Sequence, residues 1–195
     1  MKVIGLTGGI ASGKSTASAY LRELGAAIVD ADAISRASTR RGGAAFEAVC
    51  AAFGDILGAD GEIDRRKLGG IVFADEDARR KLNSIVHPAV MAESRAQIEN
   101  ARASGVKMCI LDVPLLFETG MERLCDETWL IYVPREEQIR RMAERDGLDA
   151  AAAAARIDSQ MPLEEKLKRA DVAIDSSGTI EQTQEKLRRL WEERT

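Results

Sequence analysis

The chain has 195 residues, a length that suits one α/β domain with insertions. The net charge of −4 argues against a general nucleic-acid-binding surface, and the apolar runs are too short to cross a bilayer. The first six residues already have the pattern of a strand, so we expect no signal peptide. Three cysteines without metal-ligand spacing favour free thiols in a reducing cytoplasm.

Five apolar runs predict the strands of a parallel sheet. They lack a clean alternation of apolar and polar residues, which is typical of strands buried on both faces. Helical patterns separate the runs, so we predict an α/β fold, a five-stranded parallel sheet flanked by helices, with ligands at the carboxyl ends of the strands. The predicted strands are Lys2–Leu6, Ala27–Asp30, Lys107–Val113, Thr128–Val133 and Val172–Asp175.

Residues 8–15 fit the P-loop pattern G-x-x-x-x-G-K-[ST], between the first predicted strand and a helix that ends at Leu24. Its backbone N–H groups and the helix dipole favour a polyphosphate. Lys14 can reach the β- and γ-phosphates, and the Ser15 hydroxyl can join a Mg²⁺ ion. A P-loop NTPase-type fold that binds a nucleoside triphosphate is therefore predicted. The expected nucleotide contacts are Gly9, Ile10, Ala11, Ser12, Gly13, Lys14, Ser15 and Thr16.

Residues 33–105, between the second and third strands, are too long for a simple crossover and carry helix signals throughout. A helix is expected over 44–53, and Asp64 and Asp75 stand where N-caps would precede helices over 65–73 and 76–86. Pro88 can open a further helix to about residue 103. We interpret 33–105 as a helical insertion that holds the phosphoryl acceptor.

A second insertion, residues 135–169, is rich in arginine and lysine. It predicts a helical lid over the phosphates, and the alternative is a solvated helical surface with paired charges. The core of this single domain (1–195) would then comprise 1–32, 106–134 and 170–195. The last helix, 180–191, carries Leu187, Leu190 and Trp191 as a packing stripe.

Polar residues follow two predicted strands. Asp30 and Asp32 end the second strand, where one carboxylate could accept a proton from a hydroxyl nucleophile and either could cap the next helix. We assign the catalytic role to Asp32 and a capping or supporting role to Asp30. Asp112, near the end of the third strand, resembles a Walker B aspartate. The apolar residues 114–117 could line an acceptor pocket or belong to the core, and His87 before Pro88 could be structural or functional.

Several motifs together resemble the dephospho-CoA kinase family over nearly the whole chain. They are Leu6–Ser15, Asp30-Ala31-Asp32, His87-Pro88, Asp112-Val113-Pro114-Leu115-Leu116-Phe117-Glu118, Gln138–Arg141 with Arg145, Arg156-Ile157 with Gln160, and Ala170-Asp171 leading to Gly178. The resemblance implies ATP-dependent phosphorylation of the ribose 3′-hydroxyl of dephospho-CoA, the last step of coenzyme A synthesis. It also implies a three-part layout of core, helical CoA domain and lid.

By the same resemblance, Asp32, Lys14 and Arg141 carry the catalysis. Asp32 activates the acceptor hydroxyl, and Arg141 is the lid arginine that meets the phosphates. The 170–178 segment would embrace adenine. Contacts with the acceptor are implied for Thr7, Asp32, His87, Asp112 and Leu115. No protein partner, nucleic acid or membrane is implied.

The chain departs from the family pattern at two places. The family usually has Gly where this chain has Ala11, and a methyl group is tolerated there if the backbone keeps a negative φ, so we expect activity to be retained. The family often has Asn within the stretch that here reads Asp175-Ser176-Ser177-Gly178. The rival interpretations are another nucleoside monophosphate or small-molecule kinase, and a GTPase-type switch, whose D-x-x-G and N-K-x-D elements the sequence lacks.

Overall fold

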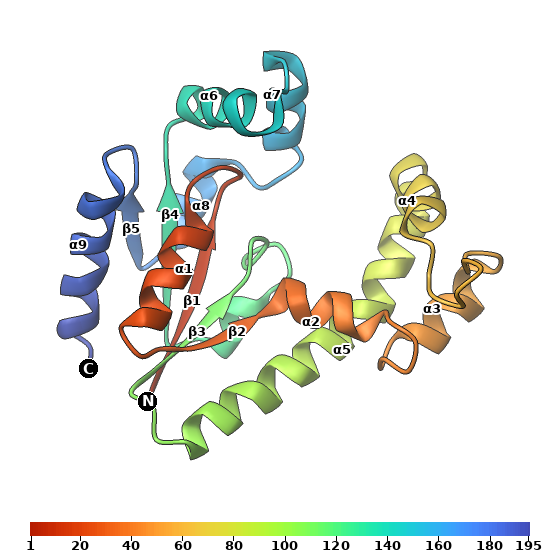
Figure 1. The fold of residues 1–195 in the computed structure, drawn as a ribbon, viewed down its shortest axis with the longest axis horizontal. Helices are drawn as coiled ribbons and strands as arrows, with labels where there is room; N and C mark the ends of the chain where they lie inside the picture. The colour runs from red at the N-terminus through yellow and green to blue at the C-terminus, as the bar shows by residue number, and fades with distance from the viewer. The chain divides into compact units, whose positions relative to one another are not determined.

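The computed structural model describes residues 1–195, which form two compact units, residues 1–29 with 98–195 and residues 30–97. The first unit is built on a five-stranded parallel sheet in the order β2-β3-β1-β4-β5 (Figure 1). All five predicted strands are confirmed, with shifts of one or two residues at some ends. The strands are β1 (Lys2–Gly8), β2 (Ala27–Asp30), β3 (Met108–Asp112), β4 (Glu127–Tyr132) and β5 (Val172–Asp175).

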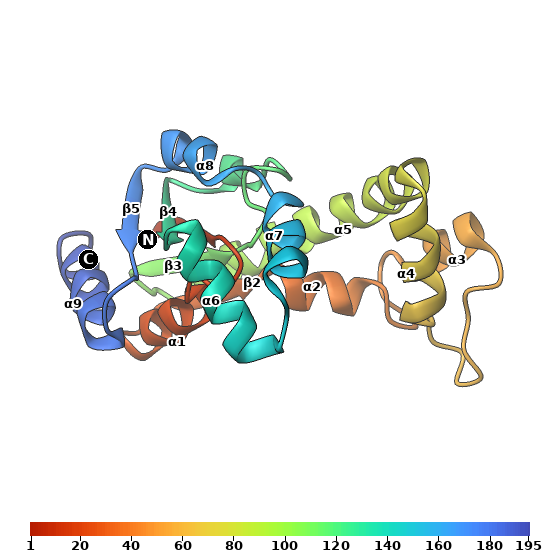
Figure 2. The same cartoon turned by 90° about the horizontal axis from the view of Figure 1, so that it is seen from above.

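Helices cover both faces of this sheet. Figure 2 shows α1 (Lys14–Glu23) and α9 (Ile180–Glu192) on one face and α8 (Leu163–Arg169) on the other. Leu21 of α1 and Leu187 of α9 are fully buried against strand residues such as Ile4 and Trp129. The predicted packing stripe of the last helix is confirmed, because Leu190 and Trp191 pack against the same cluster.

The basic segment 135–169 folds into three helices, α6 (Arg135–Asp146), α7 (Ala150–Asp158) and α8. Arg135 at the start of α6 forms two hydrogen bonds, of 2.6 and 2.9 Å, with the carboxylate of Asp158 at the end of α7. Arg140 pairs with Glu137 and Glu144 along the exposed side of α6. Some of the basic residues therefore are surface charges paired within their own segment.

The second unit is helical. It contains α2 (Ala31–Ser38), α3 (Phe46–Phe53), α4 (Arg65–Ala74) and most of α5 (Glu76–Ala103). The predicted caps are confirmed, since the Asp64 carboxylate accepts from the N–H groups of Arg66 and Lys67, and the Asp75 carboxylate accepts from the N–H of Asp77. Asp30 likewise caps α2 by accepting from the N–H of Ala33 at 2.9 Å.

One prediction is wrong at Pro88. We expected a helix to end near residue 86 and another to begin at Pro88, but α5 runs unbroken from Glu76 to Ala103 with Pro88 inside it. Proline removes one backbone donor and crowds the preceding turn, at a cost of about 3 kcal/mol in a helix interior. Apolar residues on both sides of Pro88, such as Val86 and Val90, are buried, and their packing offsets that cost.

No helix of the structure combines the length and the hydropathy that a bilayer crossing requires. The three cysteines, Cys50, Cys109 and Cys125, are free thiols, as the sequence predicts.

Candidate active site

The predicted P-loop connects β1 to α1. Gly13 precedes α1 with φ of 86°, a left-handed conformation that glycine adopts without steric cost. The first backbone N–H groups of a helix lack intrahelical partners, and the first turn of α1 contains no acidic side chain that would neutralise its positive end. This turn therefore offers donors and partial positive charge to an anion.

The carbonyl oxygens of the loop are bound from outside by side chains of the first unit. Gln138 Nε2 donates to Ile10 O at 2.7 Å, and Arg141 donates to Ala11 O at 3.3 Å. Ser176 Oγ, on the loop after β5, donates to Ser12 O at 2.6 Å. We call Gln138, Arg141 and Ser176 the carbonyl clamp. Because each outward carbonyl has a partner, the clamp favours the loop shape in which the amide groups face a bound phosphate.

The position of Gln138 also explains why residue 9 of the P-loop is a glycine. A Cβ atom on Gly9 would lie 2.5 Å from Gln138 Nε2, closer than two such atoms can approach. Gln138 is buried in spite of its polar amide. The clamp therefore needs glycine at position 9 as well as the glutamine on α6.

Arg141 is held at the P-loop by three partners. Its guanidinium bonds the Glu137 carboxylate at 2.7 Å and the Ser176 carbonyl at 2.8 Å, in addition to Ala11 O. Hydrogen bonds from Arg140 and Arg141 lower the pKa of Glu137 to about 2, so Glu137 is ionised at neutral pH. A quarter of the Arg141 side chain stays exposed. The structure brings Arg141 to the P-loop, and its contact with phosphates stays a prediction.

Lys14 and Asp112 form an ion pair. The β1–β3 register places Asp112 opposite Leu6, just before the P-loop, and its carboxylate bonds Lys14 Nζ. Both side chains are largely buried, 16% and 11% exposed. The carboxylate thus neutralises the lysine that the sequence assigns to the phosphates.

The 112–118 segment continues this edge of the sheet. Thr7 Oγ1, fully buried at the end of β1, donates to Pro114 O at 3.0 Å, so its hydroxyl has a partner within the protein. Leu116 and Phe117 are buried, whereas Leu115 is 40% exposed. Of the two interpretations of this apolar stretch, the core suits Leu116 and Phe117, and an acceptor contact remains open for Leu115.

Asp32 and His87 belong to the second unit. Asp32 lies exposed in the first turn of α2, while Asp30 serves as its N-cap. His87 is half-buried on α5, and burial lowers its pKa below the ordinary value of 6.5. The ring is therefore neutral at pH 7. Because the ring has the higher pKa in the unfolded chain, protonation favours unfolding, and the free energy of unfolding should fall as the pH drops below about 6.5.

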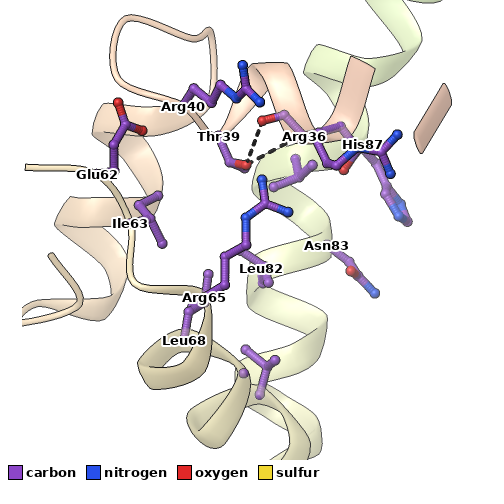
Figure 3. Close-up of a pocket in the computed structure, with 14 residues that line it drawn as sticks. Arg36, Thr39, Arg40, Glu62, Ile63, Arg65, Leu68, Leu82, Asn83 and His87 are labelled. Carbon is purple, nitrogen blue, oxygen red and sulfur yellow. Dashed lines mark hydrogen bonds between the residues drawn. The ribbon is translucent and has the colours of Figure 1, made fainter. Parts of the chain in front are cut away.

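A pocket of about 790 Å³ opens between α2, α4 and α5 in the second unit (Figure 3). Three arginines meet around it, Arg36 and Arg40 from α2 and its end and Arg65 from the start of α4, and they outnumber the one acidic lining residue, Glu62. The neutral His87 ring from α5 lines the same pocket. Figure 3 shows the Arg65 side chain extended from α4 toward α2. Pockets of this size hold small-molecule ligands, and these charges favour an anionic one.

A sequence model described as dephospho-CoA kinase matches residues 2–182. The chain belongs to the dephospho-CoA kinase family. A relative named dephospho-CoA kinase, from Carboxydothermus hydrogenoformans, is 53% identical over 96% of this chain and 91% of that protein.

Two solved structures extend the comparison. The dephospho-CoA kinase of Campylobacter jejuni superposes with a TM-score of 0.68 at 28% identity, over 100% of this chain and 97% of the other. A shikimate kinase from Acinetobacter baumannii shares the fold, with a TM-score of 0.53 at 16% identity over 98% and 92% of the two chains. Membership of the dephospho-CoA kinase family sets aside the GTPase-type interpretation of the P-loop.

Sequence reasoning assigned no role to Gln138 or Ser176, although the motifs that resemble the dephospho-CoA kinase family include both positions. Both act on carbonyl groups far away in the chain, and no local pattern shows such a contact. One signal was available, because Gln138 and Arg141 lie three residues apart and so share a face of α6. Asp171, in the same C-terminal motif, bonds the N–H and hydroxyl of Thr128 and so joins β5 to β4.

The expectation for Ala11 is wrong in its premise. The methyl group was expected to be tolerated on condition of a negative φ, but Ala11 has φ of 59°, and it is the one non-glycine residue with positive φ. The positive φ of Ala11 follows from the path of the P-loop, which takes a left-handed backbone conformation at this position. Glycine adopts that conformation without steric cost. A left-handed residue with a Cβ atom costs about 1–2 kcal/mol.

Replacing this residue should therefore stabilise the protein. Ala11→Gly should raise the free energy of unfolding by about 0.5–1 kcal/mol, because the strain removed exceeds the entropy that glycine gains in the unfolded chain. Urea unfolding measures this free energy for the wild-type protein and the variant. The matched control, Ala19→Gly on the exposed side of α1, should lower the same quantity by about 0.5–1 kcal/mol. Destabilisation by both substitutions would contradict a strained Ala11.

Proposed function

We propose that this chain transfers the γ-phosphoryl group of ATP to the ribose 3′-hydroxyl of dephospho-CoA, giving coenzyme A. Membership of the dephospho-CoA kinase family, over nearly the full length, is the observation that carries this proposal. The clamped P-loop and its lysine supply the phosphate-binding chemistry that the reaction needs. The free thiols suit the reducing cytoplasm in which we expect the enzyme to act.

Mg²⁺ would accompany the nucleotide. Mg²⁺ is usually held by one or two protein oxygens together with phosphate oxygens and water. The hydroxyl of Ser15 and the carboxylate of Asp112 can supply the protein oxygens, so the residues fit the ion. Bound there, the ion would neutralise negative charge on the phosphates. The protein needs no cage of several carboxylates for this role.

The active-site residues bind the negative charge of the phosphates and accept the proton of the acceptor hydroxyl. Lys14 leaves Asp112 and binds the β- and γ-phosphates, and the first turn of α1 binds them through its N–H groups. Asp32 accepts the proton of the 3′-hydroxyl as that oxygen bonds the γ-phosphorus and the bond to the leaving ADP oxygen breaks. Arg141 stabilises the charge of the transferring group.

The pocket of the second unit is the place we propose for the charged part of the acceptor. Its arginines, Arg36, Arg40 and Arg65, suit the pyrophosphate of dephospho-CoA. One guanidinium group can donate two parallel hydrogen bonds to two oxygens of the same phosphate. The neutral His87 ring can add a donor or an acceptor, depending on its tautomer. Thr7, Asp112 and Leu115 complete the proposed acceptor contacts.

The choice of acceptor tests this proposal. At equal concentrations, dephospho-CoA should consume ATP faster than AMP, adenosine or shikimate in a coupled ADP assay, because these lack the pyrophosphate and pantetheine portions. Phosphorus NMR of the product should show the new phosphate on the ribose 3′ position. Faster phosphorylation of AMP or adenosine would contradict the proposal and favour another P-loop kinase activity.

The assignment of the base rests on a comparison of two carboxylates. Asp32→Asn should lower kcat by roughly 100-fold or more, within the range of general-base contributions, and change the KM for ATP little. Asp30→Asn is the matched control, because asparagine caps helices as well as aspartate does. It should retain stability and most of the activity. The reverse ranking of kcat would assign the base to Asp30.

A further inference from the structure

Lys166 on α8 is the most deeply buried charged side chain of the protein, with 2% of its side chain exposed. Its ammonium lies 3.0 Å from Glu118 Oε1 and 3.3 Å from Pro114 O. Lys168, two residues later, is 69% exposed and pairs with Glu165 on the surface. The same short helix therefore carries one solvated lysine and one withdrawn from water.

Burial of an ion pair is weak evidence for stability. Removing two charges from water costs several kcal/mol, and apolar side chains of similar volume often stabilise a protein as well or better. The pair of Lys166 and Glu118 therefore calls for an explanation beyond folding energy. Its hydrogen-bond partners supply one.

Lys166 joins three segments. Pro114 O accepts from both Lys166 Nζ and Thr7 Oγ1. Thr7 is the last residue of β1 before the P-loop glycine Gly8. Glu118 Oε1 accepts from Lys166 and from the N–H of Met161, in the connection from α7 to α8. One ammonium group thus connects the 112–118 segment with the P-loop strand and with the end of the basic lid segment.

The segments that Lys166 joins lie next to residues of the proposed active site. Asp112, the partner of Lys14, lies two residues before Pro114, and the exposed Leu115 follows directly. A second pocket, of about 380 Å³, is lined by Lys166, Met161, Gly9 and Gln138. Two of the three acceptor contacts that we propose on this edge, Asp112 and Leu115, thus lie within two residues of Pro114, whose carbonyl Lys166 binds.

We propose that Lys166 is a positioning residue, which fixes the 112–118 segment and the α7–α8 connection so that they meet the acceptor. The proposal rests on the proposed function of this edge of the sheet. Lys166 acts through Pro114 and Glu118 and touches no reacting atom. Its removal should therefore weaken acceptor binding more than ATP binding.

Two variants separate positioning from stability. Lys166→Met leaves Glu118 without its partner, so the melting temperature should fall, and the KM for dephospho-CoA should rise by about tenfold or more while the KM for ATP changes by less than about twofold. In Lys166→Met/Glu118→Leu no unpaired charge remains, so the melting temperature should recover. The acceptor KM should stay raised, because Pro114 O still lacks the Lys166 ammonium and the Met161 N–H has now also lost the Glu118 carboxylate.

Lys168→Met is the matched control and should leave both KM values unchanged. The dissociation constant of dephospho-CoA, measured by calorimetry, should follow its KM. Recovery of the acceptor KM together with the melting temperature in the double variant would overturn the proposal, as would an equal rise of both KM values or failure of both variants to fold. A wild-type protein that ignores dephospho-CoA would instead contradict the proposed function.

Discussion

The hydrogen bonds that hold the P-loop carbonyls are the constraint on which the site depends. A P-loop binds phosphate because its N–H groups converge, and that arrangement turns carbonyl oxygens outward, where each needs a donor. Here Gln138, Arg141 and Ser176 supply the donors from two elements distant in the chain. The start of α6 and the loop after β5 are therefore parts of the phosphate site, although no sequence motif of the P-loop itself includes them.

Charge is arranged around this loop in pairs. Asp112 holds Lys14, Glu137 holds Arg141, and Glu118 holds Lys166. Each cation has a carboxylate partner within the protein, so the site does not leave a buried charge uncompensated. In the proposed reaction, a triphosphate replaces the carboxylate as the partner of Lys14, and Asp112 would then be available to the ion that we propose accompanies the nucleotide.

The sequence predicted what local patterns determine. Apolar runs identified all five strands. Asp64 and Asp75 were identified as caps, and capping was one of the roles open to Asp30, because capping is a contact over two or three residues. Pro88 was misread because packing along α5 outweighed a local helix-breaking rule. Ala11 was misread because the sign of φ follows from the loop as a whole. Gln138 and Lys166 act over 128 and 52 residues of chain, and only the folded sheet brings such contacts together.

The ATP affinity of Gln138→Leu tests the central claim most directly. Leucine has nearly the volume of glutamine but no donor, so Ile10 O loses its partner and the loop becomes free to leave its phosphate-binding shape. The dissociation constant of ATP, measured by isothermal titration calorimetry, should rise by about tenfold or more, equivalent to about 1.4 kcal/mol. Gln97→Leu, which removes only a surface bond to Glu93, should change it by less than about twofold. An unchanged ATP affinity in a folded Gln138→Leu variant would contradict the account.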